Sequence, residues 1–407
     1  MSNIVFAWEL GGGYGHIDTF IPIAKILQAR GHNVIWVLKD LQHASVLLDN
    51  QGFSYLQAPI RWPAVIPHPS AINYAGILRN NGFTDTSGLL ARTQAWRTVF
   101  AYLNPDLILF DHAPTALLAA RSLQYPRALF GTGFFLPPKI SPMPSIRPWL
   151  KISDKELLKV ETEIITVANT VLNKIGGKTL EILADLFQVE EDFLCTFAEL
   201  DHYKNRQNAL YWGLCFNNAV GVDPIWPSVG NTHIFAYLNK EYSGIETVLG
   251  QLRGTAYSVL VHIPGVTPAF IQKFSSANLH ISPYPVNLRK TAEHCDLVIC
   301  HANAGTMAAM LLKGKPQLML PMQVEQLLLA RNVADLGAGI VIPAEAKKPN
   351  FLTLIKDLIT GEQYKKSAEL FSEKYQSSHH QHQEKIANRC EELLKIKVEQ
   401  NNNAGPA

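Results

Sequence analysis

The chain has 407 residues, of which 47% are hydrophobic and 17% charged, and 36 basic against 34 acidic residues leave a net charge of +2. This length gives room for two to three domains, and ordinary Gly (26) and Pro (24) contents argue against a collagen-like or disordered protein. The weak net charge excludes an overall attraction to nucleic acid or anionic membranes. Five cysteines without Cys-x-x-Cys spacing predict reduced thiols, and no signal peptide or membrane span is expected. These features predict a cytoplasmic location, with peripheral membrane contact left open.

The first part of the chain follows a strand–helix–strand rhythm. A short apolar run at 4–8 leads into the Gly-rich turn 11–15, and apolar residues then recur at helical spacing from 17 to 27. This order is typical of a βαβ unit in a parallel sheet. Further strands are predicted at 34–38, 107–110 and 128–131, a helix at 114–123, and mostly helical structure over 139–208.

The same rhythm restarts after a segment rich in Pro and Gly. We expect an N-terminal Rossmann-like domain at 1–218, a linker at 219–232, a C-terminal Rossmann-like domain at 233–375, and a helix with a disordered tail at 376–407. The fold class is therefore α/β, with two doubly wound domains facing a cleft. Strands are predicted at 233–238, 257–262, 279–281, 297–300 and 317–320, a helical stretch at 361–398, and a disordered end from 401.

Residues 296–340 contain the strongest functional pattern. His301 follows a predicted strand, and Ala304-Gly305-Thr306 opens a helix, whose free amides and positive dipole end would face a bound phosphate. A second strand ends near Pro321 and is followed by the polar segment 323–326. In open α/β sheets, ligands bind at the carboxyl ends of the strands. The combination predicts a binding site for an anionic, hydroxyl-rich ligand.

This segment resembles the donor-binding region of family-1-like nucleotide-sugar glycosyltransferases of the GT-B fold, most closely the bacterial UDP-glycosyltransferase and macrolide-glycosyltransferase type. The matching residues are His301-Ala-Asn303-Ala-Gly305-Thr306, Gly314-Lys-Pro316, Pro321, Glu325-Gln326, Gly15-His16 through Pro22 to Gly31-His32, and the strand-end Asp111. The resemblance covers both expected domains.

The resemblance implies an inverting transfer of a sugar from a UDP- or dTDP-sugar to an acceptor hydroxyl. His16, at the start of the first helix, would take the acceptor's proton, and Asp111 would bind its other ring nitrogen. The sequence also allows simpler roles: His16 as an ordinary helix-start histidine, and Asp111 as a cap of the helix from Pro114. No Asp-x-Asp ends a predicted strand in the C-terminal half, so we expect neither a metal nor a cofactor.

The implied donor site draws on several segments. Backbone groups of Val286 would pair with the pyrimidine, and His301 with the helix-start amides would stabilise the leaving diphosphate. Two departures from the family pattern stand out. Ala309 stands where many relatives carry a ribose-binding Glu, so either another residue holds the ribose or the donor is a deoxyribose nucleotide such as a dTDP-sugar. Asn303 replaces a usual Gly, and Asn tolerates left-handed backbone better than most residues do. The donor-binding candidates are Gly15, Tyr237, Pro285, Val286, His301, Asn303, Ala304, Gly305, Thr306, Gln323, Glu325 and Gln326.

The resemblance implies an acceptor that is a small molecule, a lipid or a glycan. Candidates for its site, or for packing within the N-terminal domain, are Trp62, Tyr74, Phe134 and Phe135. Two alternatives stay open: a catalytically silent homologue that binds nucleotide or a partner protein, and a nucleotide-sugar epimerase of the same fold. A dehydrogenase is disfavoured, because His16 stands at the helix entrance where Gly-x-Gly-x-x-Gly is expected.

Overall fold

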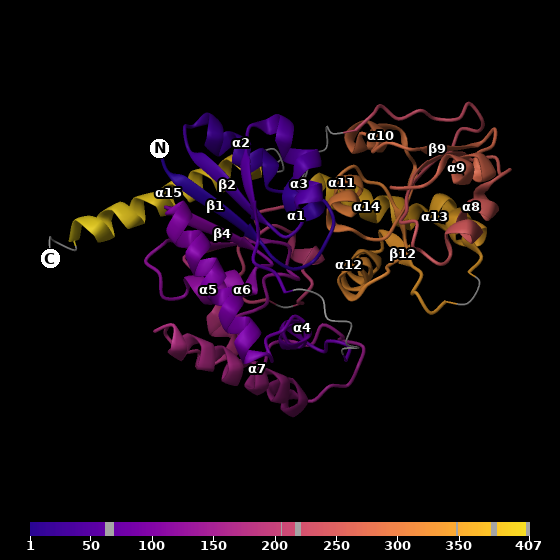
Figure 1. Ribbon diagram of the computed structural model, residues 1–407. Coiled ribbons are helices and arrows are strands. Elements are labelled where there is room, and N and C mark those ends of the chain that lie inside the picture. Colours follow the sequence, from indigo (N-terminus) through magenta and orange to yellow (C-terminus); the bar gives the residue numbers. More distant parts are fainter. Residues whose placement is uncertain (62–68, 205, 216–220, 347–348, 376–380, 404–407) are drawn as a thin grey trace. The chain divides into compact units, whose positions relative to one another are not determined.

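The computed structural model describes residues 1–61, 69–204, 206–215, 221–346, 349–375 and 381–403. The chain divides into two compact units, Met1–Cys215 with Gln381–Ala407, and Phe216–His380. Each is built around a six-stranded parallel sheet covered by helices (Figure 1). None of the helices in this described part is long and apolar enough to cross a membrane.

The first unit has the strand order β3-β2-β1-β4-β5-β6, and every pair is parallel. Apolar side chains point to both faces, as expected of a sheet covered on both sides. Its strands are β1 (Asn3–Trp8), β2 (Asn33–Leu38), β3 (Ser54–Gln57), β4 (Leu107–Asp111), β5 (Arg127–Gly131) and β6 (Glu191–Leu194). Its helices are α1 (Gly15–Asp18), α2 (Ile21–Ala29), α3 (Leu41–Leu48), α4 (Tyr74–Asn80), α5 (Thr86–Leu103), α6 (Pro114–Ala120), α7 (Asp154–Lys174) and α15 (His382–Asn403), with 3₁₀ turns η1 (Asp49–Gln51), η2 (Leu183–Phe187) and η3 (Ala198–Leu200).

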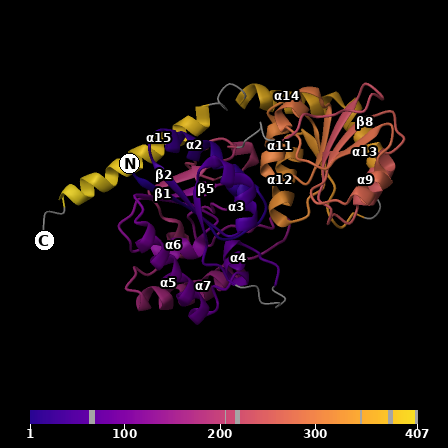
Figure 2. The ribbon, with the colours of Figure 1, turned by 45° about the horizontal axis from the view of Figure 1, so that its top comes forward.

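The second unit repeats this topology. Its sheet order is β12-β11-β10-β7-β8-β9, so the first and fourth strands of each unit are neighbours. Figure 2 shows α11 and α12 on one face of this sheet, with α9 and α13 on the other. Its strands are β7 (His233–Tyr237), β8 (Ser258–His262), β9 (Leu279–Ser282), β10 (Leu297–Cys300), β11 (Gln317–Met319) and β12 (Gly339–Val341). Its helices are α8 (Ile245–Leu252), α9 (Pro268–Phe274), α10 (Leu288–His294), α11 (Ala304–Leu311), α12 (Val324–Asp335), α13 (Phe351–Thr360) and α14 (Glu362–Tyr375).

The shared strand order fixes where ligands can bind. In both sheets the chain winds one way from the first strand and the other way from the fourth, which opens a crevice at the carboxyl ends of these two strands. In the first unit these ends are Trp8 and Asp111, which are register partners. In the second unit they are Tyr237 and Cys300, also partners.

Several expected elements differ in the structure. The helix predicted from 17 to 27 is two helices, α1 and α2, because Pro22 has no N–H to donate to the carbonyl of Asp18. Of 139–208, predicted as mostly helical, only α7 is α-helical; it begins at a capping box formed by Ser153 and Glu156. Prolines interrupt the segment that precedes α7. Residues 191–194 are not helical but form β6, which pairs with β5.

The end of the chain also differs from the expectation. The helical stretch 361–398 comprises α14 and α15, and 376–380 lie outside the described residues. α15 belongs to the first unit, where it lies beside α2 (Figure 1) and where Arg30 bonds Glu384 at 2.6 Å and Glu391 at 2.7 Å. It extends to Asn403, past the start of the predicted disordered end.

The segment predicted as a linker is not separate from the second unit. Val222 bridges to Val286, with bonds of 2.8 Å from its amide to Pro285 and from the amide of Asn287 to its carbonyl. The Ser258 hydroxyl donates to the carbonyl of Pro227 at 2.8 Å. Residues 221–232 are therefore part of the second unit.

Candidate functional sites at two sheet switch points

His16 and Asp111 meet at the switch point of the first sheet. This is the crevice at the carboxyl ends of β1 and β4, from which the chain winds in opposite directions. His16 lies in α1, which follows β1, and Asp111 is the last residue of β4. Nδ1 of His16 donates to Oδ2 of Asp111 at 2.8 Å, and the two side chains are 8% and 4% exposed. Burial raises the pKa of Asp111, while the charge and the hydrogen bond of His16 oppose that rise. The hydrogen bond fixes the tautomer of His16, so that Nε2 is the nitrogen for proton transfer.

Aromatic rings hold the imidazole of His16 in place. Trp8 stacks on it at a centroid distance of 5.0 Å, and Phe135 lies tilted at 5.0 Å. Gly11, with φ +84°, lies against Nε2, because a Cβ there would be only 2.5 Å from this nitrogen. The Lys39 ammonium donates to the Gly11 carbonyl. Glycine at position 11 is therefore required by close approach to the histidine, whereas a Cβ at Gly12, Gly13 or Gly15 would meet nothing within 4 Å.

Asp111 does not cap α6, which answers one of the alternatives left by the sequence. Glu9 takes that place: it accepts from the amide of Thr115 at 2.8 Å and also bonds the Thr115 hydroxyl. Burial raises the pKa of Glu9 to about 7, against the lowering effect of these bonds. The sequence analysis did not single out Glu9; its position directly after the strand that ends at Trp8 was the available signal.

The acceptor candidates lie partly around this site. Phe135 contacts His16, and Phe134 packs edge-on against Phe135 at 5.6 Å. Tyr74, at the start of α4, is fully buried, and its hydroxyl has no hydrogen-bond partner in the described part of the chain. Trp62 lies outside the described residues.

His301 and α11 occupy the switch point of the second sheet. His301 directly follows β10, and its Nδ1 donates to the carbonyl of Leu320 at 2.6 Å. The amide of Asn239, just past β7, donates to its Nε2 at 2.8 Å. A ring that donates at one nitrogen and accepts at the other is neutral. Burial, which lowers the pKa of His301, favours the same state.

The first amides of α11 do not donate a hydrogen bond within the helix. The first intrahelical bond runs from Met307 to the carbonyl of Asn303 at 3.0 Å, so the amides of Ala304, Gly305 and Thr306 precede it. Asn303 has φ −62°, and Ala302 instead takes the left-handed conformation, with φ 59°. The loop therefore needs no left-handed backbone at Asn303. Unpaired amides at the positive end of a helix dipole are suited to binding an anion.

Gln326 ties the two loops of this site together. Its amide nitrogen donates to Oδ1 of Asn303 at 2.6 Å, and its Oε1 accepts from the amide of Met322 at 2.8 Å. Both ends of a side chain predicted to contact sugar hydroxyls are thus occupied within the protein. Gln323 is the N-cap residue of α12, and Glu325 lies in the first turn.

The remaining donor candidates are Pro285, Val286, Tyr237 and Gly15. Val222 bonds the two neighbours of Val286, Pro285 and Asn287. In a parallel bridge of this kind the amide and carbonyl of Val286 itself point away from Val222. Tyr237 ends β7, and its ring lies 5.2 Å from that of His262. Gly15 begins α1 of the first unit.

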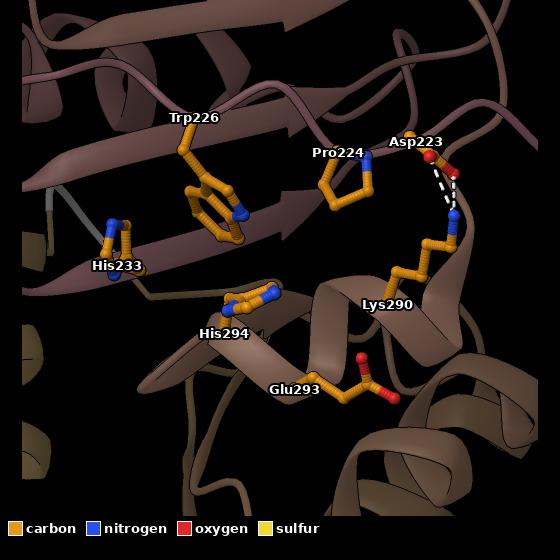
Figure 3. Close-up of a pocket in the computed structure, with 7 residues that line it drawn as sticks. All are labelled: Asp223, Pro224, Trp226, His233, Lys290, Glu293 and His294. Atoms are coloured by element: carbon orange, nitrogen blue, oxygen red, sulfur yellow. Dashed lines mark hydrogen bonds and ion pairs between the residues drawn. The ribbon is translucent and has the colours of Figure 1, made fainter.

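A separate hollow lies at the opposite edge of the second sheet (Figure 3). This cavity of about 460 Å³ lies beside His233, the first residue of β7, and His294, the last of α10. An ion pair of 2.7 Å between Asp223 and Lys290 borders it. None of the predicted site residues lines it, because they lie at the carboxyl ends of the strands.

Comparison with known proteins agrees with this geometry. Residues 277–393 match the family model described as erythromycin biosynthesis protein CIII-like, C-terminal domain. No curated protein sequence is significantly similar to the chain.

The whole chain resembles solved glycosyltransferase structures. The calicheamicin glycosyltransferase CalG4 matches with a TM-score of 0.71 and 16% identity, covering 100% of this chain and 99% of that one. Glycosyltransferase VinC in complex with dTDP gives 0.68 and 15%, covering 97% and 100%. Spinosyn rhamnosyltransferase SpnG complexed with spinosyn aglycone gives 0.65 and 17%, covering 92% and 95%. The resemblance expected from the sequence is confirmed: the chain has the GT-B fold of these glycosyltransferases, and its C-terminal region matches the CIII-like domain family.

Proposed function

We propose that the protein is an inverting, metal-independent glycosyltransferase that moves a sugar from a nucleotide-diphosphate donor to a hydroxyl of a small-molecule acceptor. The buried hydrogen bond between His16 and Asp111 carries this proposal. An imidazole held by a carboxylate at one nitrogen is suited to take a proton at the other. Both the family model and the solved relatives support the same reaction class.

The reaction follows from this pair. Nε2 of His16 accepts the proton of the acceptor hydroxyl as its oxygen attacks the anomeric carbon. The bond from that carbon to the diphosphate breaks on the opposite face, which inverts the configuration. Asp111 stabilises the imidazolium that forms. General-base assistance of this kind accelerates a reaction roughly 10²–10⁴-fold.

We assign the binding of the donor's diphosphate to backbone amides. The amides of Ala304, Gly305 and Thr306 receive the leaving charge at the start of α11. His301 is neutral, and both of its nitrogens are bonded, so we revise its role from charge stabilisation to holding Asn239 and Leu320 in place. We assign pairing with the pyrimidine to the amide and carbonyl of Val286, which point away from the Val222 bridge.

The nucleotide is proposed to be dTDP. Ala309 lies in α11, is 6% exposed, and offers no carboxylate to grip two ribose hydroxyls. VinC and SpnG have both been solved with thymidine diphosphate, which supports this choice. Calorimetric titration of the purified protein with dTDP and UDP tests it, and tighter binding of UDP would contradict a deoxyribose donor.

Hydrolysis of the donor without acceptor tests the reaction class. Purified protein is incubated with UDP-, dTDP- and GDP-glucose, and release of the nucleoside diphosphate is measured for the wild type and for His16→Ala. We expect release from the dTDP-sugar and its loss in His16→Ala. Absence of release from every donor would favour a silent homologue. Release unaffected by His16→Ala would remove this histidine as the base for water.

A further inference from the structure

Three consecutive glycines at 11–13 form a turn between β1 and α1, beside His16. Among the described residues, only one makes a hydrogen bond to this turn: the ammonium of Lys39 donates to the carbonyl of Gly11. Glycine loses more conformational freedom on folding than any other residue, so a run of three is costly to hold in one conformation. The position of the turn therefore depends on Lys39.

The backbone of Lys39 is itself firmly anchored at the carboxyl end of β2. The side-chain amide of Gln57, the last residue of β3, donates to the carbonyl of Leu38 at 3.2 Å and to that of Lys39 at 2.8 Å. The amide of Ala58 also donates to the carbonyl of Leu38, at 2.9 Å. The ammonium thus extends from a fixed point to the turn that follows the neighbouring strand, β1.

The turn lies against the nitrogen that is proposed to accept the proton. Gly11 has φ +84°, and a Cβ placed on it would be 2.5 Å from Nε2 of His16. Proton transfer needs the two heavy atoms within about 2.6–3.2 Å of each other, and a misplacement of about 1 Å can cost roughly 10²-fold in rate. A displaced turn would therefore change how an acceptor oxygen reaches Nε2.

We propose that Lys39 is a positioning residue of the reaction. Its bond to Gly11 holds the turn of residues 11–13 against one side of Nε2 of His16, so that an acceptor oxygen reaches this nitrogen in a single orientation. The proposal rests on the proposed function, because it takes His16 as the base. Lys39 acts through the turn and does not touch the substrate.

The surroundings of Lys39 favour a strong bond to the turn. The side chain is half-buried, and this burial lowers its pKa, while the negative charges of Asp40 and Glu9 oppose the lowering. A hydrogen bond from a charged donor is roughly twice as strong as one between neutral groups. Arginine at this position keeps the charged donor, whereas methionine keeps an unbranched side chain without it.

The chain supplies two matched controls. Lys25 is an exposed lysine of α2, so Lys25→Met removes the same charge elsewhere in the first unit. Gly12 has no positive φ, and a Cβ placed on it would meet no atom within 4 Å. Gly12→Ala therefore restricts the turn without adding a contact, because Ala has less conformational freedom than Gly.

The test makes two measurements on the wild type, Lys39→Met, Lys39→Arg, Lys25→Met, Gly12→Ala and the double variant Lys39→Met/Gly12→Ala, after thermal unfolding has shown that each protein folds. The first is the release of dTDP from dTDP-glucose with water as the acceptor, together with the affinity for dTDP. The second needs no turnover. It is the rate at which diethyl pyrocarbonate modifies His16, read by peptide mass spectrometry, with the exposed His294 of α10 as the internal reference.

We expect Lys39→Met to release dTDP about tenfold more slowly, with unchanged affinity for dTDP, because the water that attacks is no longer held in one orientation. His16 should be modified several-fold faster in this variant, since a released turn no longer covers one side of Nε2. Lys39→Arg and Lys25→Met should resemble the wild type. Gly12→Ala should restore part of both properties to Lys39→Met, which a role of the charge alone does not predict.

Three results would overturn the proposal: modification of His16 at the wild-type rate in Lys39→Met, the same changes in Lys25→Met, or no recovery in the double variant. If the wild type releases no dTDP, the proposed function fails. The modification rates then still decide whether Lys39 holds the turn against His16.

Discussion

The two switch points of this protein differ in whether their buried polar side chains have hydrogen-bond partners. In the first unit, Oδ1 of Asp111, both nitrogens of His112 and the Tyr74 hydroxyl are buried and have no partner among the described residues. In the second unit, His301 and Gln326 are satisfied by protein groups at both ends. The same topology thus supports a site that works through side chains and a site that presents backbone amides.

This difference agrees with the ligand that each site is proposed to bind, an acceptor in the first unit and a diphosphate in the second. A diphosphate is recognised by N–H groups and a helix dipole, which need only a rigid loop. An acceptor hydroxyl must lose a proton, which needs a side chain of suitable basicity in a fixed tautomer. Substitutions in the first unit should therefore affect chemistry, and those in the second should affect donor affinity and stability together.

The largest effect is expected from Asp111→Asn. The amide no longer stabilises the imidazolium, and its NH₂ group favours the wrong tautomer of His16, so transfer should fall roughly 10²–10⁴-fold. Single-turnover transfer at saturating donor measures this, with dTDP affinity as the control that should not change. Unchanged transfer would show that the pair is structural.

Glu9→Gln should change the pH dependence of stability. The pKa of Glu9 is raised from 4.5 to about 7 by burial, so the folded state holds this proton where the unfolded state releases it. The wild type should therefore lose stability as pH rises from 4.5 to 7, by about 3 kcal/mol from this group. Urea unfolding at pH 4 to 8 measures the loss.

Glu9→Gln keeps an acceptor for the amide of Thr115 and should lack that part of the slope. Parallel curves for the two proteins would show that folding leaves the pKa of Glu9 unchanged.

Gln326→Leu tests the second site. It leaves Asn303 and the amide of Met322 without their partners, so the free energy of unfolding should fall by about 1–3 kcal/mol and dTDP should bind more weakly. Rates at saturating donor should stay near the wild-type value. A variant that instead bound dTDP normally but lost discrimination between donor sugars would place Gln326 on the sugar, as the sequence predicted.

The smallest effect is expected away from both sites, in Arg30→Ala. Arg30 is 28% exposed and joins α2 to Glu384 and Glu391 of α15. Ion pairs this close to solvent contribute below about 1 kcal/mol and weaken with salt. Thermal unfolding at low and high salt measures this, and neither donor binding nor transfer should change. A loss of transfer would tie α15 to the chemistry.

The sequence alone determined the fold class and the candidate site residues. Alternating apolar runs and helical periods predict most strands correctly, because a buried parallel strand must be apolar on both faces. The resemblance implied that Asp111 binds His16, and the structure brings the two together because the carboxyl ends of the parallel strands β1 and β4 share one edge of the sheet. The strands β3, β6 and β12 carry weaker patterns, and only their neighbours in the sheet define them.

Only the tertiary structure decided what each polar group is bonded to. His301 and Gln326 share the motif with the anion-binding amides, yet bonds from Asn239 and to Asn303 turn them into supports. Glu9 rather than Asp111 caps α6, and Gly11 lets the backbone lie against Nε2 of His16. Hydrogen bonds between residues far apart in the chain cannot be read from sequence periodicity. Each such bond depends on how two different βα units are positioned in the folded protein.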